Sequence, residues 1–247
     1  MKLEGNTILI TGGATGIGFA LAERLVKLGN RVIVCGRRED KLDEARRKVP
    51  ELHTYVCDVG SESDRIELAE RVRHDFPELN VLINNAGIQQ RINLQKAQGS
   101  WSYYKQEIAI NVEAPIHLTM LLLPHLVERG VGAVVNVTSG LAFTPMAAAP
   151  VYSATKAAFH SFTVSLRHQL AATKIEVIEI VPPAVNTDLG GAGVHTFGVP
   201  LEEFADGVFR GLEQGLPEIG YGSSEKAMRM SREEIDAAAQ MLARVPF

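Results

Sequence analysis

Tyr152 and Lys156 lie four residues apart in Tyr152–Ala172, a segment whose pattern predicts a helix. Side chains at this spacing share one helix face, one turn apart, so a lysine ammonium can lie beside a tyrosine phenol. The pKa of an ordinary tyrosine is about 10, which makes it a slow proton donor and acceptor at neutral pH. Because a nearby cation favours the phenolate and lowers that pKa, the pair predicts a general acid–base site.

Two other polar side chains are placed to support such a pair. Ser139 follows the predicted strand Gly132–Thr138, where its hydroxyl can orient the oxygen of a bound substrate. Asn111 lies inside the predicted helix Ser102–Glu128, and asparagine is mildly unfavourable there. We expect Asn111 to bend this helix and to hold a water that links Lys156 to solvent. Each residue alone can be an ordinary surface residue, so the prediction depends on their combination.

The segments that must position these residues alternate between two kinds. Runs rich in Val and Ile predict strands at Thr7–Thr11, Arg31–Cys35, His53–Cys57, Val81–Asn84, Gly132–Thr138, Ile175–Val181 and Glu218–Tyr221. Amphipathic segments predict helices at Gly16–Leu28, Arg38–Val49, Glu62–Asp75, Ser102–Glu128, Tyr152–Ala172 and Leu201–Glu213, and a last one from about Glu225 to Ala243. The alternation predicts a single-domain α/β Rossmann fold over residues 1–247, with a doubly wound seven-stranded parallel sheet and helices on both faces.

The first predicted strand leads into a glycine-rich turn, Gly12-Gly13-Ala14-Thr15-Gly16-Ile17-Gly18, which opens the first helix. Glycines let the backbone turn sharply and approach a phosphate closely, and the free N–H groups of a helix N-terminus attract an anion. A purely structural turn can have the same composition. Its position in the first strand–turn–helix of a parallel α/β chain favours a dinucleotide-binding turn.

In this turn, Thr11-Gly12-x-x-x-Gly16-x-Gly18 resembles the motif of the compact, single-domain branch of the short-chain dehydrogenase/reductase family. Other motifs of that family recur in order over almost the whole chain: Asp58, the segment Asn84-Asn85-Ala86-Gly87, and the catalytic set Asn111, Ser139, Tyr152 and Lys156. Within the family, Lys2–Gly18 and Gly198–Met230 resemble the DltE-type oxidoreductases. The resemblance implies hydride transfer between a nicotinamide cofactor and a carbonyl or alcohol substrate.

The resemblance also implies which residues bind the cofactor: Gly12, Thr15, Gly16, Ile17, Gly18, Asp58, Val59, Asn85, Ala86, Gly87, Tyr152, Lys156, Pro182, Val185 and Thr187. One position departs from the family's Pro-Gly-x-Val-x-Thr pattern, because Pro183 replaces the glycine. Proline fixes φ and has no N–H, so we expect a stiffer root for the glycine-rich loop Asp188–Pro200. We expect this loop, within a substrate-loop region at 188–215, to close over the substrate.

The end of the second predicted strand indicates which nicotinamide cofactor binds. NAD enzymes usually have an acid at this point, which contacts the ribose 2′-OH. Here Gly36 leaves room and Arg37 offers a guanidinium suited to a 2′-phosphate, although two acidic residues follow soon after. Thr15 can add a hydroxyl. We therefore expect NADP (NADPH) to be favoured over NAD.

The residues between Ser139 and Tyr152 indicate the substrate class. They include Leu141, Phe143 and Met146 and carry no charge, which suits an apolar ketone or aldehyde. The alternative function is a cofactor-binding regulatory protein without turnover. Such proteins usually lose the serine, tyrosine or lysine, and all three are present here.

Composition narrows the choice of partners. The chain has 25 basic and 29 acidic side chains and a formal charge of -4, which disfavours nucleic-acid binding. Two cysteines, Cys35 and Cys57, cannot form a disulfide framework and fit a cytoplasmic protein. No run of 18 apolar residues and no metal-ligand spacing occurs, so we expect neither a membrane partner nor a metal. Ser102–Glu128 and Tyr152–Ala172 are apolar on more than one face, which predicts a homo-oligomer, a dimer or most favourably a homotetramer.

Overall fold

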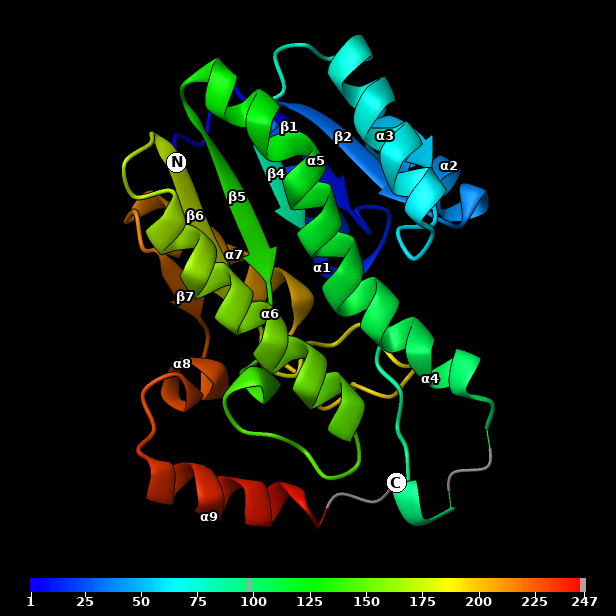
Figure 1. Cartoon of the computed structure of the whole chain (residues 1–247), viewed down its shortest axis with the longest axis vertical. Coiled ribbons are helices and arrows are strands. Elements are labelled where there is room, and N and C mark those ends of the chain that lie inside the picture. The colour runs from blue at the N-terminus through cyan, green and yellow to red at the C-terminus, as the bar shows by residue number, and fades with distance from the viewer. Residues whose placement is uncertain (97–98, 245–247) are drawn as a thin grey trace.

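The protein is built around one parallel β-sheet. The computed structural model describes residues 1–96 and 99–244. Its strands pair in the order β3-β2-β1-β4-β5-β6-β7, each neighbouring pair parallel. They are β1 (Thr7–Thr11), β2 (Arg31–Gly36), β3 (His53–Val56), β4 (Val81–Asn84), β5 (Gly132–Val137), β6 (Ile175–Val181) and β7 (Glu218–Gly220). The predicted seven-stranded parallel sheet is confirmed, with ends that differ by a residue at most (Figure 1).

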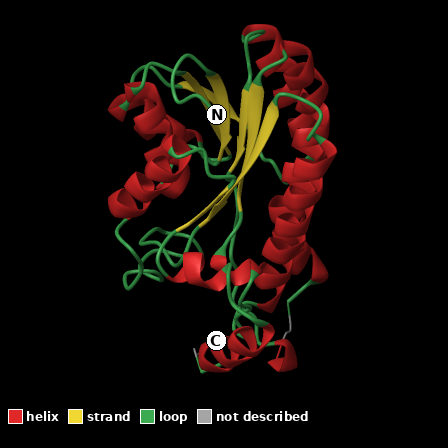
Figure 2. Cartoon of the chain, turned by 90° about the vertical axis from the view of Figure 1, so that its left-hand side faces the viewer, coloured by secondary structure: helices red, strands yellow, loops and turns green. Residues whose placement is uncertain are grey.

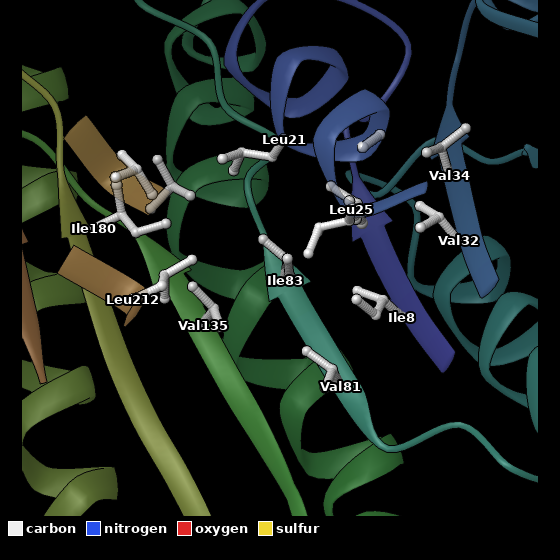
Figure 3. Close-up of a cluster of buried hydrophobic side chains, with 14 of the residues drawn as sticks. Ile8, Leu21, Leu25, Val32, Val34, Val81, Ile83, Val135, Ile180 and Leu212 are labelled. Carbon is white, nitrogen blue, oxygen red and sulfur yellow. The ribbon is translucent and has the colours of Figure 1, made fainter. Parts of the chain in front are cut away.

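Helices cover both faces of the sheet (Figure 2). On one face lie α1 (Gly16–Lys27), α2 (Glu39–Lys48) and α7 (Leu201–Glu213). On the other lie α3 (Glu62–Asp75), α5 (Ala114–Arg129) and α6 (Pro150–Gln169). Successive side chains of a strand point to opposite faces, so Ile8 and Ile10 pack under α1 while Leu9 packs under α5. Figure 3 shows the first of these two cores, where Leu21 and Leu25 of α1 meet the strands.

The helix predicted at Ser102–Glu128 is present but interrupted. It consists of α4 (Trp101–Ile108), a π-helical turn at Ala109–Glu113 and α5. The π turn contains Asn111, in line with the expectation that the helix departs from regular geometry there. By length and composition alone, Trp101–Arg129 is apolar enough to cross a membrane, and 44% of its most apolar window is buried inside the protein. A core helix of a soluble protein meets the same criterion, and the absence of a membrane partner stays a prediction.

The prediction of one last helix from Glu225 to Ala243 is wrong. The segment forms two helices, α8 (Ser223–Ala227) and α9 (Arg232–Leu242), separated by a turn. Ser231 explains the break, because its side chain accepts the N–H of Glu234 while the Glu234 carboxylate accepts the N–H of Ser231. This reciprocal capping box starts a new helix at that point.

We expect Gly132→Ala to destabilise the sheet. A Cβ added at Gly132, the first residue of β5, would overlap the backbone oxygen of Asn80. Since neither backbone can move freely inside the sheet, the free energy of unfolding in urea should fall by about 1–3 kcal/mol. Gly36→Ala in β2 is the matched control, because the nearest atom to its added Cβ is 4.0 Å away. Equal losses in the two variants would contradict the steric explanation.

Candidate functional site

The glycine-rich turn lies at the carboxyl end of β1, where it leads into α1. Gly12 and Gly16 have φ of 64° and 54°, in the left-handed region that favours glycine. A Cβ at Gly18 would overlap both the Asn85 amide and the Gly12 carbonyl oxygen. Thr15 is exposed and is the N-cap of α1, but its side chain makes no capping hydrogen bond. The turn therefore presents backbone close to the N-terminus of α1, as a phosphate-binding cradle requires.

The segment after β4 braces this turn. The Thr11 hydroxyl accepts the N–H groups of Asn85 and Ala86, each at 3.0 Å. The Asn85 amide in turn donates to the carbonyl oxygens of Thr11 and Gly12, at 2.9 and 3.1 Å. Four hydrogen bonds thus fix the turn against the β4 edge. From the sequence, Thr11 was recognised only as the first residue of the glycine motif, and the bracing role of its hydroxyl was not predicted.

Residues after β2 and β3 lie together farther along the same edge. Gly36 ends β2, and Arg37 follows it, half exposed, with its guanidinium 4.0 Å from the Asp58 carboxylate. Asp58 also accepts the Gly60 N–H at 2.9 Å, which fixes its side chain. Val59 is buried. The residues predicted to hold the adenosine end of the cofactor therefore form one cluster, in which Arg37 already has an acidic neighbour.

Residues after β6 face the glycine turn from the other side. The Thr187 side chain lies 3.5 Å from the point where a Cβ on Gly16 would be. Val185 is buried and pairs with Val199 in an isolated bridge, which closes the base of the 188–200 loop. At the root, the Pro182 carbonyl accepts the Gly140 N–H at 2.9 Å. The backbone at Pro183 does not have a positive φ, so it accommodates a proline where the family pattern has a glycine.

The predicted catalytic side chains converge where β5 ends and α6 begins. Tyr152 and Lys156 lie on the buried face of α6, with the Lys156 ammonium 5.7 Å from the Tyr152 ring centre. Lys156 donates to the Val137 carbonyl of β5 at 2.9 Å. Ser139 follows β5, is buried, and accepts the Leu141 N–H. Phenol, ammonium and serine hydroxyl are therefore grouped at one place on the carboxyl edge.

The Lys156 ammonium alone does not lower the pKa of Tyr152. Burial raises the pKa of Tyr152 to about 12, against a lowering effect of its hydrogen bond with Ser139. Burial likewise lowers the pKa of Lys156 to about 8, against the effects of the Glu107 and Glu179 carboxylates. Desolvation outweighs the neighbouring charges because both side chains are almost fully enclosed. Any lowering of the tyrosine pKa must come from a charge that arrives with a ligand.

Asn111 joins the π turn to the catalytic helix. Its amide donates to the Ile88 carbonyl at 2.9 Å and to the Thr155 hydroxyl at 3.1 Å, and its oxygen accepts the Ile88 N–H. A Cβ on Gly87 would lie 3.3 Å from the Asn111 oxygen and 3.6 Å from the Lys156 ammonium nitrogen. Gly87 thus leaves the space in which Asn111 and Lys156 come close together.

A second buried carboxylate, missed from the sequence, lies behind these residues. Glu179 of β6 is fully buried, accepts the Thr138 hydroxyl at 2.6 Å and lies 2.9 Å from Nδ1 of His160. The pair raises the pKa of His160, chiefly through that hydrogen bond. An acid in the middle of the apolar run Ile175–Val181 was the available signal. Its effect is to fix Thr138, and with it the position of Ser139.

One histidine of the 188–200 loop is buried. His195, in the 188–200 loop, is 8% exposed, and its Nδ1 has no hydrogen-bond partner among the described residues. Burial lowers its pKa, with a smaller contribution from the positive charge of Arg91. The loop itself turns at Gly190, Gly191 and Gly193, which all have positive φ. In residues 1–96 and 99–244, no cluster of three or more His, Cys, Asp or Glu side chains could hold a metal ion.

Comparison with known proteins agrees with this geometry. A family model described as short chain dehydrogenase matches residues 6–195. The uncharacterized oxidoreductase DltE of Bacillus subtilis (strain 168) is 48% identical over 224 residues, which cover 89% of each chain. A short chain dehydrogenase from Burkholderia cenocepacia J2315, solved in complex with NADP, superimposes with a TM-score of 0.84 at 26% identity, covering 100% of both chains. A 3-ketoacyl-(acyl-carrier-protein) reductase from Brucella melitensis, complexed with NADH, has a TM-score of 0.80 at 25% identity, over 90% of this chain and 100% of that one.

The chain therefore belongs to the short-chain dehydrogenase family, and it is an oxidoreductase of that family. Both the resemblance found in the sequence and the DltE-type subgroup are confirmed.

We expect Thr11→Val to loosen the glycine turn. Valine keeps the shape of threonine but removes the acceptor of two N–H groups, at a cost of about 1–3 kcal/mol in the free energy of unfolding. Amide hydrogen exchange at Asn85 and Ala86 should become faster than in the wild-type protein. Thr7→Val, at the other end of β1, is the control. Unchanged protection at both amides would show that the hydroxyl does not brace the turn.

Proposed function

We propose that the protein is an NADP-dependent carbonyl reductase or alcohol dehydrogenase acting on an apolar ketone or aldehyde. The observation that carries this proposal is the grouping of Tyr152, Lys156 and Ser139 beside the braced glycine turn. A phenol, an ammonium and a serine hydroxyl at the carboxyl edge of such a sheet supply the acid and the donors that carbonyl reduction needs.

The residues present fit a dinucleotide cofactor. The glycine turn would hold its pyrophosphate at the N-terminus of α1; side chains at Gly12 and Gly18 would clash with Asn85, Ala86 and the Gly12 carbonyl and so displace the turn. Asp58 and Arg37 would hold the adenosine end of the cofactor. Thr187, which faces the turn, would hold the nicotinamide end. The bound nicotinamide cofactor supplies or accepts the hydride.

The protein side chains do the proton chemistry. Ser139 and Tyr152 would orient the carbonyl oxygen of the substrate by hydrogen bonds, and Tyr152 would give its proton to that oxygen. The Lys156 charge would favour the phenolate that remains on Tyr152. Lys156 is itself held by Val137 at the end of β5, so the ammonium is fixed relative to Ser139.

An apolar substrate is supported by the walls around the site. Leu141, Phe143 and Met146 are only partly buried and lie between Ser139 and the start of α6. A hollow of about 240 Å³ opens nearby, between the segment after β4 and the start of α6. It is lined by Ile92, Asn93, Leu94, Gln95, Ala147 and Pro150, with no charged residue. Such a surface favours an apolar or aryl group over a phosphate or carboxylate.

We expect the purified protein to oxidise NADPH with members of a panel of apolar ketones and aldehydes. Tyr152→Phe should lower kcat by about a thousandfold while NADPH still binds, since general acid catalysis typically contributes 10²–10⁴-fold. Tyr55→Phe, which removes a hydroxyl bonded to Asp75 on α3, is the control and should keep full activity. No turnover with any substrate, but retained NADPH binding, would favour a regulatory protein without turnover.

The NADP preference is supported by Arg37 and by the lack of an acid at the end of β2. We expect Arg37→Ala to reduce kcat/KM with NADPH about tenfold or more, because a charge-assisted hydrogen bond is worth about 1.5–3 kcal/mol. The kcat/KM with NADH should change little. Arg46→Ala, an exposed arginine on α2, serves as the control. A wild-type protein that uses NADH tenfold better than NADPH would overturn the assignment.

We further propose a homo-oligomer, most favourably a tetramer. Met120 and Val127 of α5 are 66% and 41% exposed, and Trp101 of α4 is 67% exposed, so the long helix has an apolar outer side. Symmetric pairing would cover it. Light scattering at micromolar concentration should give a multiple of 26.9 kDa, and Met120→Lys should reduce it. Met241→Lys is the control, because Met241 of α9 is similarly exposed, and it should leave the mass unchanged. A monomeric wild-type protein would refute the proposal.

A further inference from the structure

Glu107 is a fully buried acid next to the catalytic helix. It is the buried residue of α4, whose other side chains are exposed or partly exposed. Its Oε1 accepts the Gln90 N–H at 2.8 Å, whereas its Oε2 has no hydrogen-bond partner among the described residues. No sequence pattern predicts its burial, because Glu107 has an ordinary position in an amphipathic helix.

The side chain of the neighbouring Gln90 also has a buried oxygen that lacks a hydrogen-bond donor among the described residues. Its amide nitrogen donates to the Tyr103 carbonyl at 3.0 Å, but its buried Oε1 has no partner in the part of the chain that the structure describes. Buried acceptors normally have a donor. A proton on the Glu107 carboxyl would remove the charge from its unpartnered, buried Oε2. Accordingly, burial raises the pKa of Glu107 to about 7, against the effects of the Gln90 N–H and the Lys156 charge.

The groups around Glu107 are those that the reaction uses. Helix α4 packs on α6, which carries Tyr152 and Lys156, and both respond to the Glu107 charge. Asn111, one turn after Glu107, binds Ile88, two residues before Gln90. The other charge that acts on Lys156 is Glu179 of β6, which is paired with His160 of α6.

We propose that Glu107 is a positioning residue that keeps the protons on Lys156 and Tyr152, and so sets the alkaline limit of carbonyl reduction. A carboxylate favours the protonated form of every nearby group. Both effects act in one direction, since reduction requires the phenol as well as the ammonium.

The first test uses the pH profile and depends on the proposed function. Glu107→Gln keeps the size of the side chain, and its amide can donate to Gln90, so we expect it to fold. The alkaline limb of reductive kcat/KM should move down by about one pH unit. Glu107→Asp keeps the carboxylate, so its alkaline limb should lie closer to that of the wild-type protein. Glu113→Gln, an exposed acid in the same helix, is the matched control and should leave the limb in place.

The second test needs no activity. Isotope-labelled lysine gives the Lys156 pKa by NMR, with its signal assigned by Lys156→Arg. We expect a lower Lys156 pKa in Glu107→Gln and an unchanged one in Glu113→Gln. An unmoved Lys156 pKa in a folded Glu107→Gln would overturn the proposal, as would an unmoved alkaline limb. If no carbonyl compound is reduced while the Lys156 pKa still falls, the proposed function fails, and only the effect of Glu107 on the Lys156 proton stands. If Glu107→Gln does not fold, Glu107→Met, which also removes the charge at similar size, takes its place: its Lys156 pKa should fall, and an unmoved one would overturn the proposal.

Discussion

The whole site depends on the contact between the ends of β1 and β4. These neighbouring strands leave the sheet in opposite senses, with one connection crossing to each face, so a crevice forms where they part. The Thr11 hydroxyl and the Asn85 amide close the bottom of this crevice by reciprocal hydrogen bonds. Through them, the N-terminus of α1 is held at a fixed distance from the segment that leads to Asn111. The proposed phosphate-binding turn and the proposed proton-transfer residues therefore share one rigid base.

The second constraint is the cost of burying charge. Lys156, Glu107 and Glu179 are all enclosed between the sheet and the long helices. Removing such groups from water is expensive, and it is tolerated only where opposite charges and hydrogen bonds compensate. Here the Val137 carbonyl compensates Lys156, the Thr138 hydroxyl and His160 compensate Glu179, and the Gln90 N–H compensates one oxygen of Glu107.

The sequence was sufficient for the sheet and for the residues that carry recognisable motifs. Val- and Ile-rich runs located most of the strands, because strands buried on both faces tolerate little else. It was insufficient where the outcome depends on three-dimensional surroundings. The pKa of Tyr152 follows from enclosure, which spacing alone does not reveal, and the cation expected to dominate lies 5.7 Å from the ring centre. The burial of His195 depends on how a glycine-rich loop folds back onto the protein. The break before α9 depends on a local capping box.

The π-helical turn at Ala109–Glu113 has a consequence for how the family's chains can change in length. A π turn holds one residue more than an α-helical turn, so it rotates everything after it by about 100° relative to a regular helix. Before it, Glu107 points into the protein, and after it, Leu118 and Leu122 do so. Because the turn absorbs its extra residue, deleting one residue here would restore a regular helix and leave both inward stripes facing the protein, although the position of Asn111 would change. Deleting one residue elsewhere in α4 or α5 would instead turn one of these stripes toward solvent. The π turn is therefore the place in this long helix where the chain can lose a residue and keep the register of the segments on either side.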